Sequence, residues 1–318
     1  MSNEKIPLGI STCLLGQSVR YNGGHKMDRF ILHTLGDYFE YVPVCPEVEC
    51  DMPIPRESMR LEGNPEEYRL ITHKTKEDRT RQMQEWAHER LKELEDKDLC
   101  GYIFKSKSPS SGLFRVKIYA PEGHHVWNTG TGIWAGMFRE HFPLLPLEEN
   151  GRLHDPALRE NFIERVFVFK RWRDFIAQKP GYGDLVEFHT RHKLLIMSHD
   201  IQLYRSMGKL VAEGRKQAFD DLLDEYLKML LAAMIKPGTV KKHVNVLQHI
   251  MGYFKKELSS DEKQEFLEIM DQYRREHLPL IVPVTILNHF IRKYGNEYLE
   301  KQWYLHPHPT EMKLRTHV

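Results

Sequence analysis

The hydrophobic pattern of the chain changes near residue 150, and this change is what most constrains the fold. In the first part, short apolar runs bounded by glycine and proline are typical of buried strands. These runs are Ile6–Thr12, Tyr41–Val44, Tyr102–Phe104 and Val116–Tyr119. Between the second and third runs, Lys76–Lys97 carries apolar residues at helical spacing. Strands that alternate with helices predict an α/β domain with a largely parallel sheet.

The second part of the chain has the pattern of helices throughout. Asp155-Pro156 is a favourable N-cap followed by proline at the first helical position. Apolar residues then recur at helical spacing, in runs that are interrupted at Pro180-Gly181, Pro237-Gly238 and Pro279. The sequence therefore predicts two domains, an α/β domain over residues 1–148 and an all-α helical domain over residues 149–318.

The composition is that of a folded, soluble chain. Of its 318 residues, 41% are hydrophobic, and no apolar run approaches the ~20 residues needed to cross a bilayer. The N-terminus lacks the features of a secretory signal, so we expect a cytoplasmic protein without membrane contact. In that compartment four cysteines are not expected to form disulfides, which leaves metal binding, catalysis or burial. The net charge of +1 divides into −4 over residues 1–150 and +5 over 151–318, a hint of a polyanionic partner for the second part.

Reactive side chains follow three of the predicted strands. Cys13 lies in the loop after the first strand, and Cys45 and Cys50 lie in the loop after the second. A serine-rich loop over residues 105–112 follows the third. Because loops at the carboxyl ends of strands meet at one crevice of an open α/β sheet, these thiolates could share one iron–sulfur cluster or one zinc ion. Cys100 begins a strand, where burial in the core is the expected role.

Three motifs in these loops resemble those of the thiouracil desulfurase family. They are SxCLLG from Ser11 with RYxGGHK downstream, PVCPE from Pro43 followed by PxPRE, and FKSKSPSSG from Phe104. The second part resembles the YbgA-type domain in its GRLHDP, FHTRHK and NVLQH segments. The order of the two domains is similar to that of bacterial tRNA 4-thiouridine desulfidases. The resemblance implies a 4Fe-4S cluster held by three cysteines, with its fourth iron open to the substrate's sulfur.

Carried over position by position, the resemblance implies that Cys13 and Cys45 are two of the cluster ligands. The third family cysteine falls at Ser111 in this sequence, and a serine oxygen suits such clusters far less well than a thiolate. Either Cys50 supplies the missing thiolate, or the site is degenerate and binds its cluster weakly or not at all. We favour Cys50, because it lies in the segment that the resemblance places at the site.

The chemistry that the resemblance implies is hydrolytic rather than redox. An iron that accepts the thiocarbonyl sulfur acts as a Lewis acid, and water then replaces the sulfur, which leaves as sulfide. A carboxylate must take a proton from the water, and Glu47, close to Cys45, is the candidate. Ser108 is the candidate hydroxyl that orients this base or relays a proton. From the residue pattern alone, Glu47 would be a carboxylate at a helix start and Ser108 a turn residue.

The loops also hold candidates for contact with the substrate or with RNA, namely Arg20, Asn22, Arg56 and Ser111. The turn that Asn22 opens could bring backbone amides toward a phosphate or a base, although turn formation alone explains its glycines. Arg56 could contact RNA or pair with Glu49 or Glu57.

In the second part, Arg191 and Lys193 belong to one of several short basic clusters on predicted helices. Such clusters suit a phosphate backbone, but a solvated helix face has the same pattern. His189 and His192, in the same segment, fit either core positions or a zinc site that lacks a third ligand.

The predicted function is desulfuration of 4-thiouridine in tRNA, giving uridine and sulfide, with the second domain as the docking module. Chemistry on a tRNA base requires that the base be unstacked, which favours a separate domain that binds the RNA. The alternatives are desulfuration of free thiouracil or a thionucleotide, a non-catalytic RNA-binding protein that has lost its cluster, and a zinc-binding protein.

Overall fold

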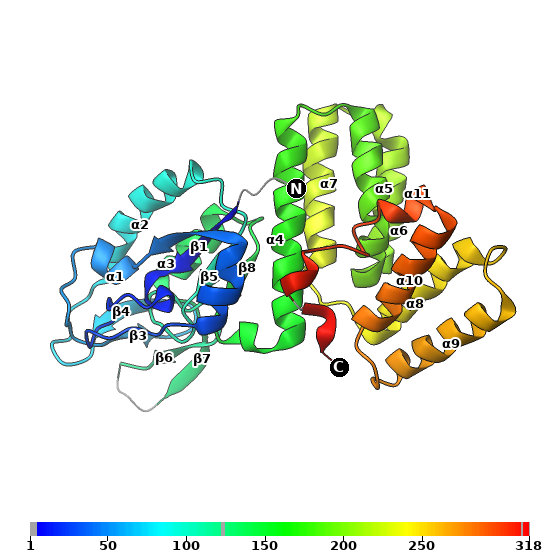
Figure 1. Cartoon of the computed structure of the whole chain (residues 1–318). Helices are drawn as coiled ribbons and strands as arrows, with labels where there is room; N and C mark the ends of the chain where they lie inside the picture. Colours follow the sequence, from blue (N-terminus) through cyan, green and yellow to red (C-terminus); the bar gives the residue numbers. More distant parts are fainter. Residues whose placement is uncertain (1–4, 122–124, 313, 318) are drawn as a thin grey trace. The chain divides into compact units, whose positions relative to one another are not determined.

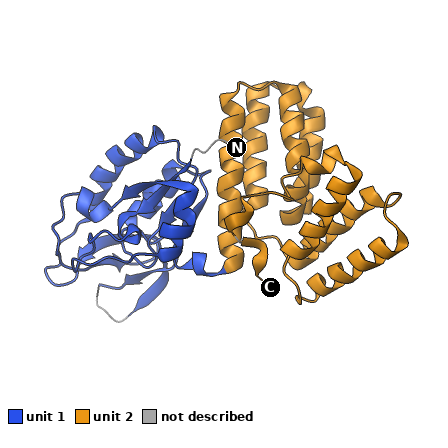
Figure 2. Cartoon of the chain, viewed as in Figure 1, with its two compact units in different colours: residues 1–155 blue, residues 156–318 orange. Residues whose placement is uncertain are grey.

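The computed structural model describes residues 5–121, 125–312 and 314–317 of the chain. Two units are formed, unit 1 over residues 1–155 and unit 2 over residues 156–318 (Figure 2). Unit 1 contains sheets and helices, whereas the regular structure described in unit 2 is helical (Figure 1). The expected α/β domain with a largely parallel sheet, followed by an all-α domain, is thus confirmed.

The first sheet of unit 1 is parallel throughout and has the strand order β2-β1-β5-β8. Its strands are β1 Ile6–Ser11, β2 Phe39–Val44, β5 Tyr102–Phe104 and β8 Leu147–Glu149. Strands β1 and β5 approach closely at Gly9, where a Cβ atom would lie 2.2 Å from the ring of Tyr102. Glycine at this position therefore lets the large aromatic ring pack against the strand at the centre of the sheet.

A second, mixed sheet lies in unit 1, where the sequence predicted one largely parallel sheet. Its strand order is β4-β3-β6-β7. The strands are β3 Met59–Gly63, β4 Tyr68–Thr72, β6 Val116–Tyr119 and β7 Val126–Gly130. The predicted run Val116–Tyr119 is thus a strand, but it belongs to this second sheet. The other three strands have only one or two buried residues each, so their hydrophobic signal is too weak for prediction.

Besides the short π-helix Phe30–Thr34 and 3-10 turns, three α-helices are described in unit 1. They are α1 Pro46–Glu49, α2 Thr80–Glu95 and α3 Ile133–His141. The periodicity over Lys76–Lys97 predicts α2, and its apolar stripe is buried at Met83, Ala87, Leu91 and Leu94. Helices α2 and α3 meet through Trp86 and Trp134, whose ring centroids are 5.0 Å apart.

Unit 1 ends at Asp155, whereas the sequence placed the boundary at 148. After β8 the chain forms the 3-10 turn Arg152–His154. His154 Nε2 lies 3.7 Å from Asp28 Oδ2, so the turn belongs with unit 1. Helix α4 begins at Pro156, where the N-cap pattern predicts a helix start.

Unit 2 is built from helices around a shared apolar core. Their bounds are α4 Pro156–Ala177, α5 Tyr182–His199, α6 Ile201–Glu213, α7 Phe219–Met234, α8 Val240–Met251, α9 Ser260–Arg274, α10 Ile281–Tyr294 and α11 Glu297–Glu300. Trp172 of α4 stacks on Tyr226 of α7 with 5.5 Å between ring centroids. After α11 the chain continues as a C-terminal segment with short 3-10 turns. No helix among the described residues is long and apolar enough to cross a membrane.

Candidate active site

The loops that follow β1, β2 and β5 meet around one cavity of about 360 Å³ in unit 1. These strands are parallel, so their carboxyl ends lie at the same edge of the sheet. Seven residues that the sequence singles out line this cavity: Cys13, Arg20, Cys45, Glu47, Arg56, Ser108 and Ser111. The structure therefore brings together most of the candidate site of the α/β domain.

Cys13 and Cys45 place two free thiols on the cavity wall. Cys13 lies in the 3-10 turn Thr12–Leu15 directly after β1, and Cys45 separates β2 from α1. Their exposed fractions are 9% and 7%. Burial, together with the nearby Glu47 carboxylate, raises the pKa of the Cys13 thiol to about 11 and that of the Cys45 thiol to about 12. Without a bound cation, both thiols are therefore protonated at neutral pH.

These raised pKa values predict how the metal-free protein reacts with iodoacetamide. The thiolate is the nucleophile, and below the pKa its fraction rises tenfold per pH unit. Alkylation of Cys13 and Cys45 in the folded chain is therefore expected to accelerate about tenfold per unit between about pH 7 and pH 10. Mass spectrometry of quenched samples measures each site, and the denatured chain is the control, since its thiols level off above a pKa of ~8.5. A plateau near pH 9 in the folded chain would contradict the raised pKa values.

Cys50 is buried but is not among the residues that line the cavity. It ends α1, and its Sγ lies 3.6 Å from the carbonyl oxygen of Glu47. Ser111, unlike Cys50, lines the cavity together with Cys13 and Cys45. The assignment of Cys50 as a cluster ligand thus stays a prediction. Cys100, with an exposed fraction of 0%, lies in the core just before β5.

Glu47 lies at the centre of the polar contacts in the cavity. Its Oε2 accepts a hydrogen bond from Arg56 Nη2 at 3.3 Å and lies 3.6 Å from Cys45 Sγ. Its Oε1 accepts a hydrogen bond from the Ser110 hydroxyl. The next carboxylate along the helix, Glu49, instead accepts from the backbone N–H of Cys45 at 2.8 Å and does not line the cavity. Glu47 is therefore the carboxylate of α1 that a ligand in the cavity can meet.

Ser110, which the sequence analysis did not single out, is the serine in contact with Glu47. Ser108 reaches the carboxylate through it, since the Oγ atoms of Ser108 and Ser110 are 2.8 Å apart. Ser111 Oγ lies 3.3 Å from Ser110 Oγ. The serines thus form a chain of hydroxyls that ends on Glu47. Because three serines crowd one turn, the sequence carries no signal for which of them meets the carboxylate.

Arg56 fixes the Glu47 carboxylate to the first loop. Its Nη2 donates both to Glu47 Oε2 and to the carbonyl oxygen of Val19, the latter at 2.9 Å. The pairings considered from the sequence, with Glu49 or Glu57, are wrong for the described residues, in which Arg56 forms its ion pair with Glu47.

Lys105 and Arg20 add positive charge to the cavity wall. Lys105 follows β5 directly, as Cys45 follows β2, so its position in the sequence was a signal for a place in the site. Burial lowers the pKa of its ammonium group. Asn22 does not line the cavity, and its Oδ1 accepts from the backbone N–H of Gly24 at 3.2 Å. Asn22 therefore stabilises its own turn.

Both parts of the chain are similar to known proteins. The 2-thiouracil desulfurase family model matches residues 8–150, a range that contains every residue lining the cavity. A protein family of unknown function, DUF1722, matches residues 193–309. The uncharacterized protein YbgA of Escherichia coli strain K12 is 32% identical over 157 residues, which cover 49% of this chain and 93% of YbgA. The chain is a fusion of a thiouracil desulfurase-like domain with a YbgA-type domain.

A solved structure of the 4Fe-4S-dependent thiouracil desulfidase TudS is also similar to part of this chain. It is 27% identical to the chain, with a TM-score of 0.40. The alignment covers 49% of this chain and 97% of the TudS chain.

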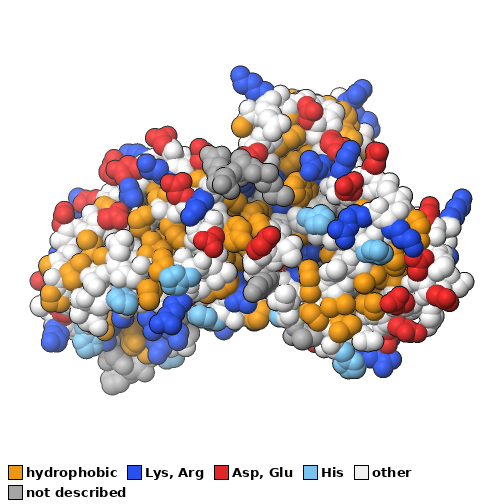
Figure 3. Space-filling model, in the orientation of Figure 1, with side chains coloured by type: hydrophobic (Ala, Val, Ile, Leu, Met, Phe, Trp, Pro, Cys, Tyr) orange, Lys and Arg blue, Asp and Glu red, His pale blue; other side chains and the backbone are white. Residues whose placement is uncertain are grey.

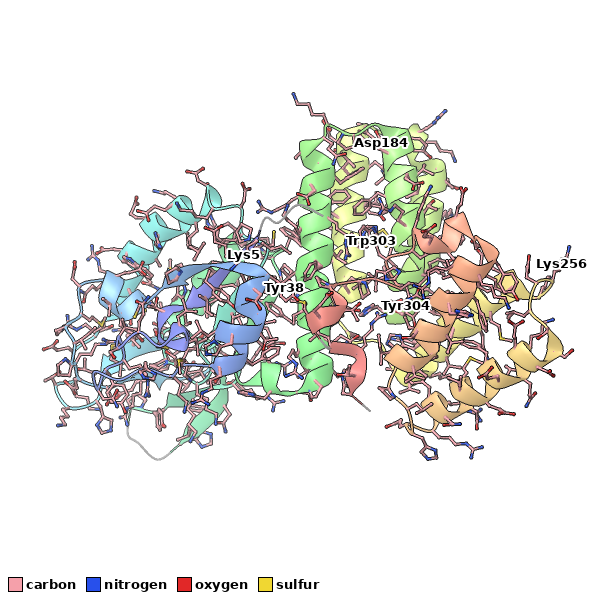
Figure 4. All side chains as sticks on the ribbon, in the orientation of Figure 1. Lys5, Tyr38, Asp184, Lys256, Trp303 and Tyr304 are labelled. Atoms are coloured by element: carbon pink, nitrogen blue, oxygen red, sulfur yellow. The ribbon has the colours of Figure 1, made fainter. Side chains whose placement is uncertain are left out.

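In the YbgA-type domain, Arg191 and Lys193 of α5 pack on aromatic rings. The Arg191 guanidinium lies 4.7 Å from the ring centroid of Trp303, and Lys193 Nζ lies 4.8 Å from that of Tyr298. Figure 4 labels Trp303 on the segment that follows α11. These contacts hold both cations in defined positions, and their contact with RNA stays a prediction.

His189 and His192, also on α5, occupy core positions. His189 Nδ1 lies 3.2 Å from the hydroxyl of Tyr226, and His192 Nδ1 donates to the carbonyl oxygen of Phe188 at 2.7 Å. Burial lowers the pKa of His189 to about 4 and that of His192 well below its usual range. Neither belongs to a group of three or more possible metal ligands in the described parts of the chain. The core interpretation of these histidines is therefore the one that the structure supports.

Proposed function

We propose that unit 1 removes sulfur from a thiolated pyrimidine with the help of a 4Fe-4S cluster bound in the cavity. The observation that carries this proposal is the convergence of Cys13, Cys45 and Glu47 on one cavity, within the range matched by the 2-thiouracil desulfurase family. In the reaction, one water replaces sulfur at the ring carbon. The C=S bond becomes C=O, the sulfur leaves as hydrogen sulfide, and no electrons are gained or lost.

The cavity wall suits such a cluster, because it offers two thiols as ligands and a buried hydrogen-bond donor that has no partner in the described parts of the chain. Cys13 and Cys45 are unpaired, and both need a bound cation to lose their protons. Arg56 Nε is buried without a hydrogen-bond partner among the described residues, which is costly unless a ligand meets it. For the third ligand we propose Cys50, because a soft thiolate suits iron–sulfur clusters better than the Ser111 oxygen. When bound, the cluster supplies an iron that accepts the substrate's sulfur as a Lewis acid.

The other wall residues take the remaining roles in this proposal. Glu47 accepts a proton from the attacking water. Arg56 and Ser110 hold its carboxylate in place, and Ser108 extends the hydroxyl chain along which the proton can move. Lys105, whose ammonium lines the cavity, offsets negative charge that develops on the ring and the departing sulfur.

We propose 4-thiouridine in tRNA as the substrate, with unit 2 as the docking module. The support is the net charge of +5 over residues 151–318 and the two cations, Arg191 and Lys193, that aromatic rings hold in place. Figure 3 shows basic side chains interspersed with acidic ones on the face of unit 2 drawn there. Docking would therefore depend on particular cations rather than on a uniform positive field. Free thiouracil or a thionucleotide is the second candidate, because unit 1 holds all the proposed chemistry.

Anaerobic reconstitution with iron and sulfide, followed by single-turnover assays, tests both proposals. The full chain is given tRNA that contains 4-thiouridine or, separately, free thiouracil, and sulfide release is measured. We expect iron uptake and faster turnover of the tRNA. Absence of iron uptake would contradict the cluster and leave a non-catalytic RNA-binding protein as the alternative. Turnover of the free base without turnover of tRNA would assign the substrate to the free base and remove the docking role.

Arg191→Ala and Lys193→Ala are each expected to weaken tRNA binding and to reduce its salt dependence. Each lost phosphate contact should lower the slope of log K against log salt by about 0.9 or less. Fluorescence anisotropy of labelled tRNA over a salt series measures the slope, and thermal unfolding checks the fold. Lys228→Ala, an exposed position on α7, is the matched control. An unchanged slope in both α5 variants would count against phosphate contacts there.

A further inference from the structure

A group of buried ionisable side chains lies in unit 2 where the C-terminal segment packs on α4. Glu160 and Glu164 lie one turn apart on α4, and His308 comes from the C-terminal segment. Glu164 and His308 have exposed fractions of 3% and 9%. One possible ligand atom from each of the three residues lies within 4.8 Å of the others. Figure 4 labels Trp303 and Tyr304 on the same segment, among the helices of unit 2.

The ring of His308 has an unmet nitrogen at this position. Its Nδ1 lies 3.2 Å from the carbonyl oxygen of Pro309. Because a carbonyl only accepts, Nδ1 carries the proton of the neutral ring and Nε2 keeps a lone pair. Nε2 is buried and has no hydrogen-bond partner among the described residues. A histidine that donates one ring N–H to a backbone carbonyl and keeps the other nitrogen free has the arrangement found in metal-ligating histidines.

The two carboxylates are held in place by hydrogen bonds from neighbouring side chains. Glu164 Oε1 accepts from Arg315 Nη2 at 2.9 Å, and its Oε2 lies 3.1 Å from His199 Nε2. Glu160 Oε1 accepts from Arg315 Nε at 3.1 Å. Glu160 Oε2 lies 3.7 Å from His317 Nε2, which is longer than a hydrogen bond. Carboxylates that bind metals are themselves hydrogen-bonded in this way, so Arg315 and His199 would act as orienting partners.

Neighbouring cationic side chains contact both carboxylates of this group. Arg315 is the one arginine or lysine among the described residues that forms an ion pair with either carboxylate. His199 is a second cationic partner, because its Nδ1 lies 2.8 Å from the carbonyl oxygen of Lys236 and its Nε2 lies 3.1 Å from Glu164 Oε2, so both ring nitrogens donate. The polar atom of the group that stays without a partner among the described residues is His308 Nε2, and a bound cation would supply that partner.

We propose that Glu160, Glu164 and His308 form a site for a divalent first-row transition cation. Two carboxylates and one imidazole are ligands that suit Zn²⁺, Mn²⁺ and Fe²⁺, whereas Mg²⁺ and Ca²⁺ prefer oxygen ligands alone. Both glutamates also line a cavity of about 250 Å³, which leaves room for water at a remaining coordination position. The cation would tie the C-terminal segment to α4.

Titration of Mn²⁺ into the full chain tests this site. Mn²⁺ is chosen because it prefers carboxylates over thiols, so the cysteines of unit 1 interfere little. Loss of the electron paramagnetic resonance signal of free Mn²⁺ reports binding, and we expect one equivalent per chain. His308→Gln and Glu160→Gln are each expected to weaken binding at least ~10-fold. His306→Gln, an exposed position two residues before His308, is the matched control and should bind as the wild type does.

A second readout separates the cation site from a purely structural ion-pair group. A cation that binds the folded chain raises its Tm, so Mn²⁺ should raise the Tm of the wild type and of His306→Gln but not that of His308→Gln. If His308→Gln does not fold, Glu160→Gln gives the same comparison. Failure of the wild type to bind Mn²⁺, or equal binding by the wild type, His308→Gln and Glu160→Gln, would overturn the proposal. The group would then be an ion-pair anchor for the C-terminal segment.

Discussion

Replacement of Glu47 by glutamine is expected to slow desulfuration by ~10²–10⁴-fold, the range for loss of a general base. Glutamine keeps the size of the side chain and still accepts the hydrogen bond that the Ser110 hydroxyl donates to Glu47 Oε1. It cannot accept a proton from water, so the chemical step should slow while the bound iron stays. Single-turnover rates on 4-thiouridine tRNA, normalised to iron content, measure this effect.

The control for Glu47→Gln is Glu40→Gln, at an exposed position of the strand that leads into the same loop. This change removes the same charge without touching the cavity and should leave the rate within about threefold. Ser110→Ala should fall between the two, because the carboxylate remains but loses one of its positioning contacts. A normal rate in Glu47→Gln would show that another group accepts the proton. Loss of iron together with activity would show that Glu47 acts on cluster retention instead.

Three of the four strands of the sheet that carries the site could be predicted from their apolar runs, whereas β8 could not, because two of its three residues are glutamates. In β1, Ile6, Leu8 and Ile10 alternate and all reach the core, so the period of two is visible in the sequence. Of the second sheet only β6 could be predicted, since β3 buries only Leu61 and β7 only Gly130. A strand with one buried residue among partly exposed ones has no clear hydrophobic period in its sequence. Contacts with the rest of the fold then decide how it pairs.

In the candidate site, sequence motifs identify some residues, whereas other contacts are visible only in the folded structure. Cys13, Cys45 and Glu47 could be named because each follows a predicted strand in a recognisable motif, and the parallel sheet brings their loops together. The contact of Ser110 with Glu47 could not, because it joins residues 63 positions apart in the chain. The burial of Cys50 away from the cavity wall depends on how the short helix α1 turns. No sequence pattern reports such a rotation.

Loss of the third ligand is expected to be the most damaging change to the cluster. Comparing the iron retention of Cys50→Ala with that of Ser111→Ala shows which of the two residues is this ligand. Cys50→Ala should lower iron retention at least ~100-fold and abolish turnover, if the thiolate of Cys50 is the ligand. Ser111→Ala should leave iron retention unchanged, because it removes an oxygen that suits the cluster poorly. Iron and sulfide content after anaerobic desalting, with the absorption spectrum of the cluster, measure both variants.

The double variant Cys50→Ala with Ser111→Cys provides the sharper comparison. Ser111 lines the same cavity as Cys13 and Cys45, so a thiol at this position would face the ligand that the two cysteines share. We therefore expect Ser111→Cys to restore the iron that Cys50→Ala loses, and with it at least part of the turnover. Cys100→Ala, which removes a core thiol away from the cavity wall, controls for the loss of any buried cysteine. If Ser111→Ala lost iron while Cys50→Ala kept it, the Ser111 oxygen would be the ligand. The cavity-lining position of Ser111 would then matter more for iron binding than the preference of iron for a thiolate.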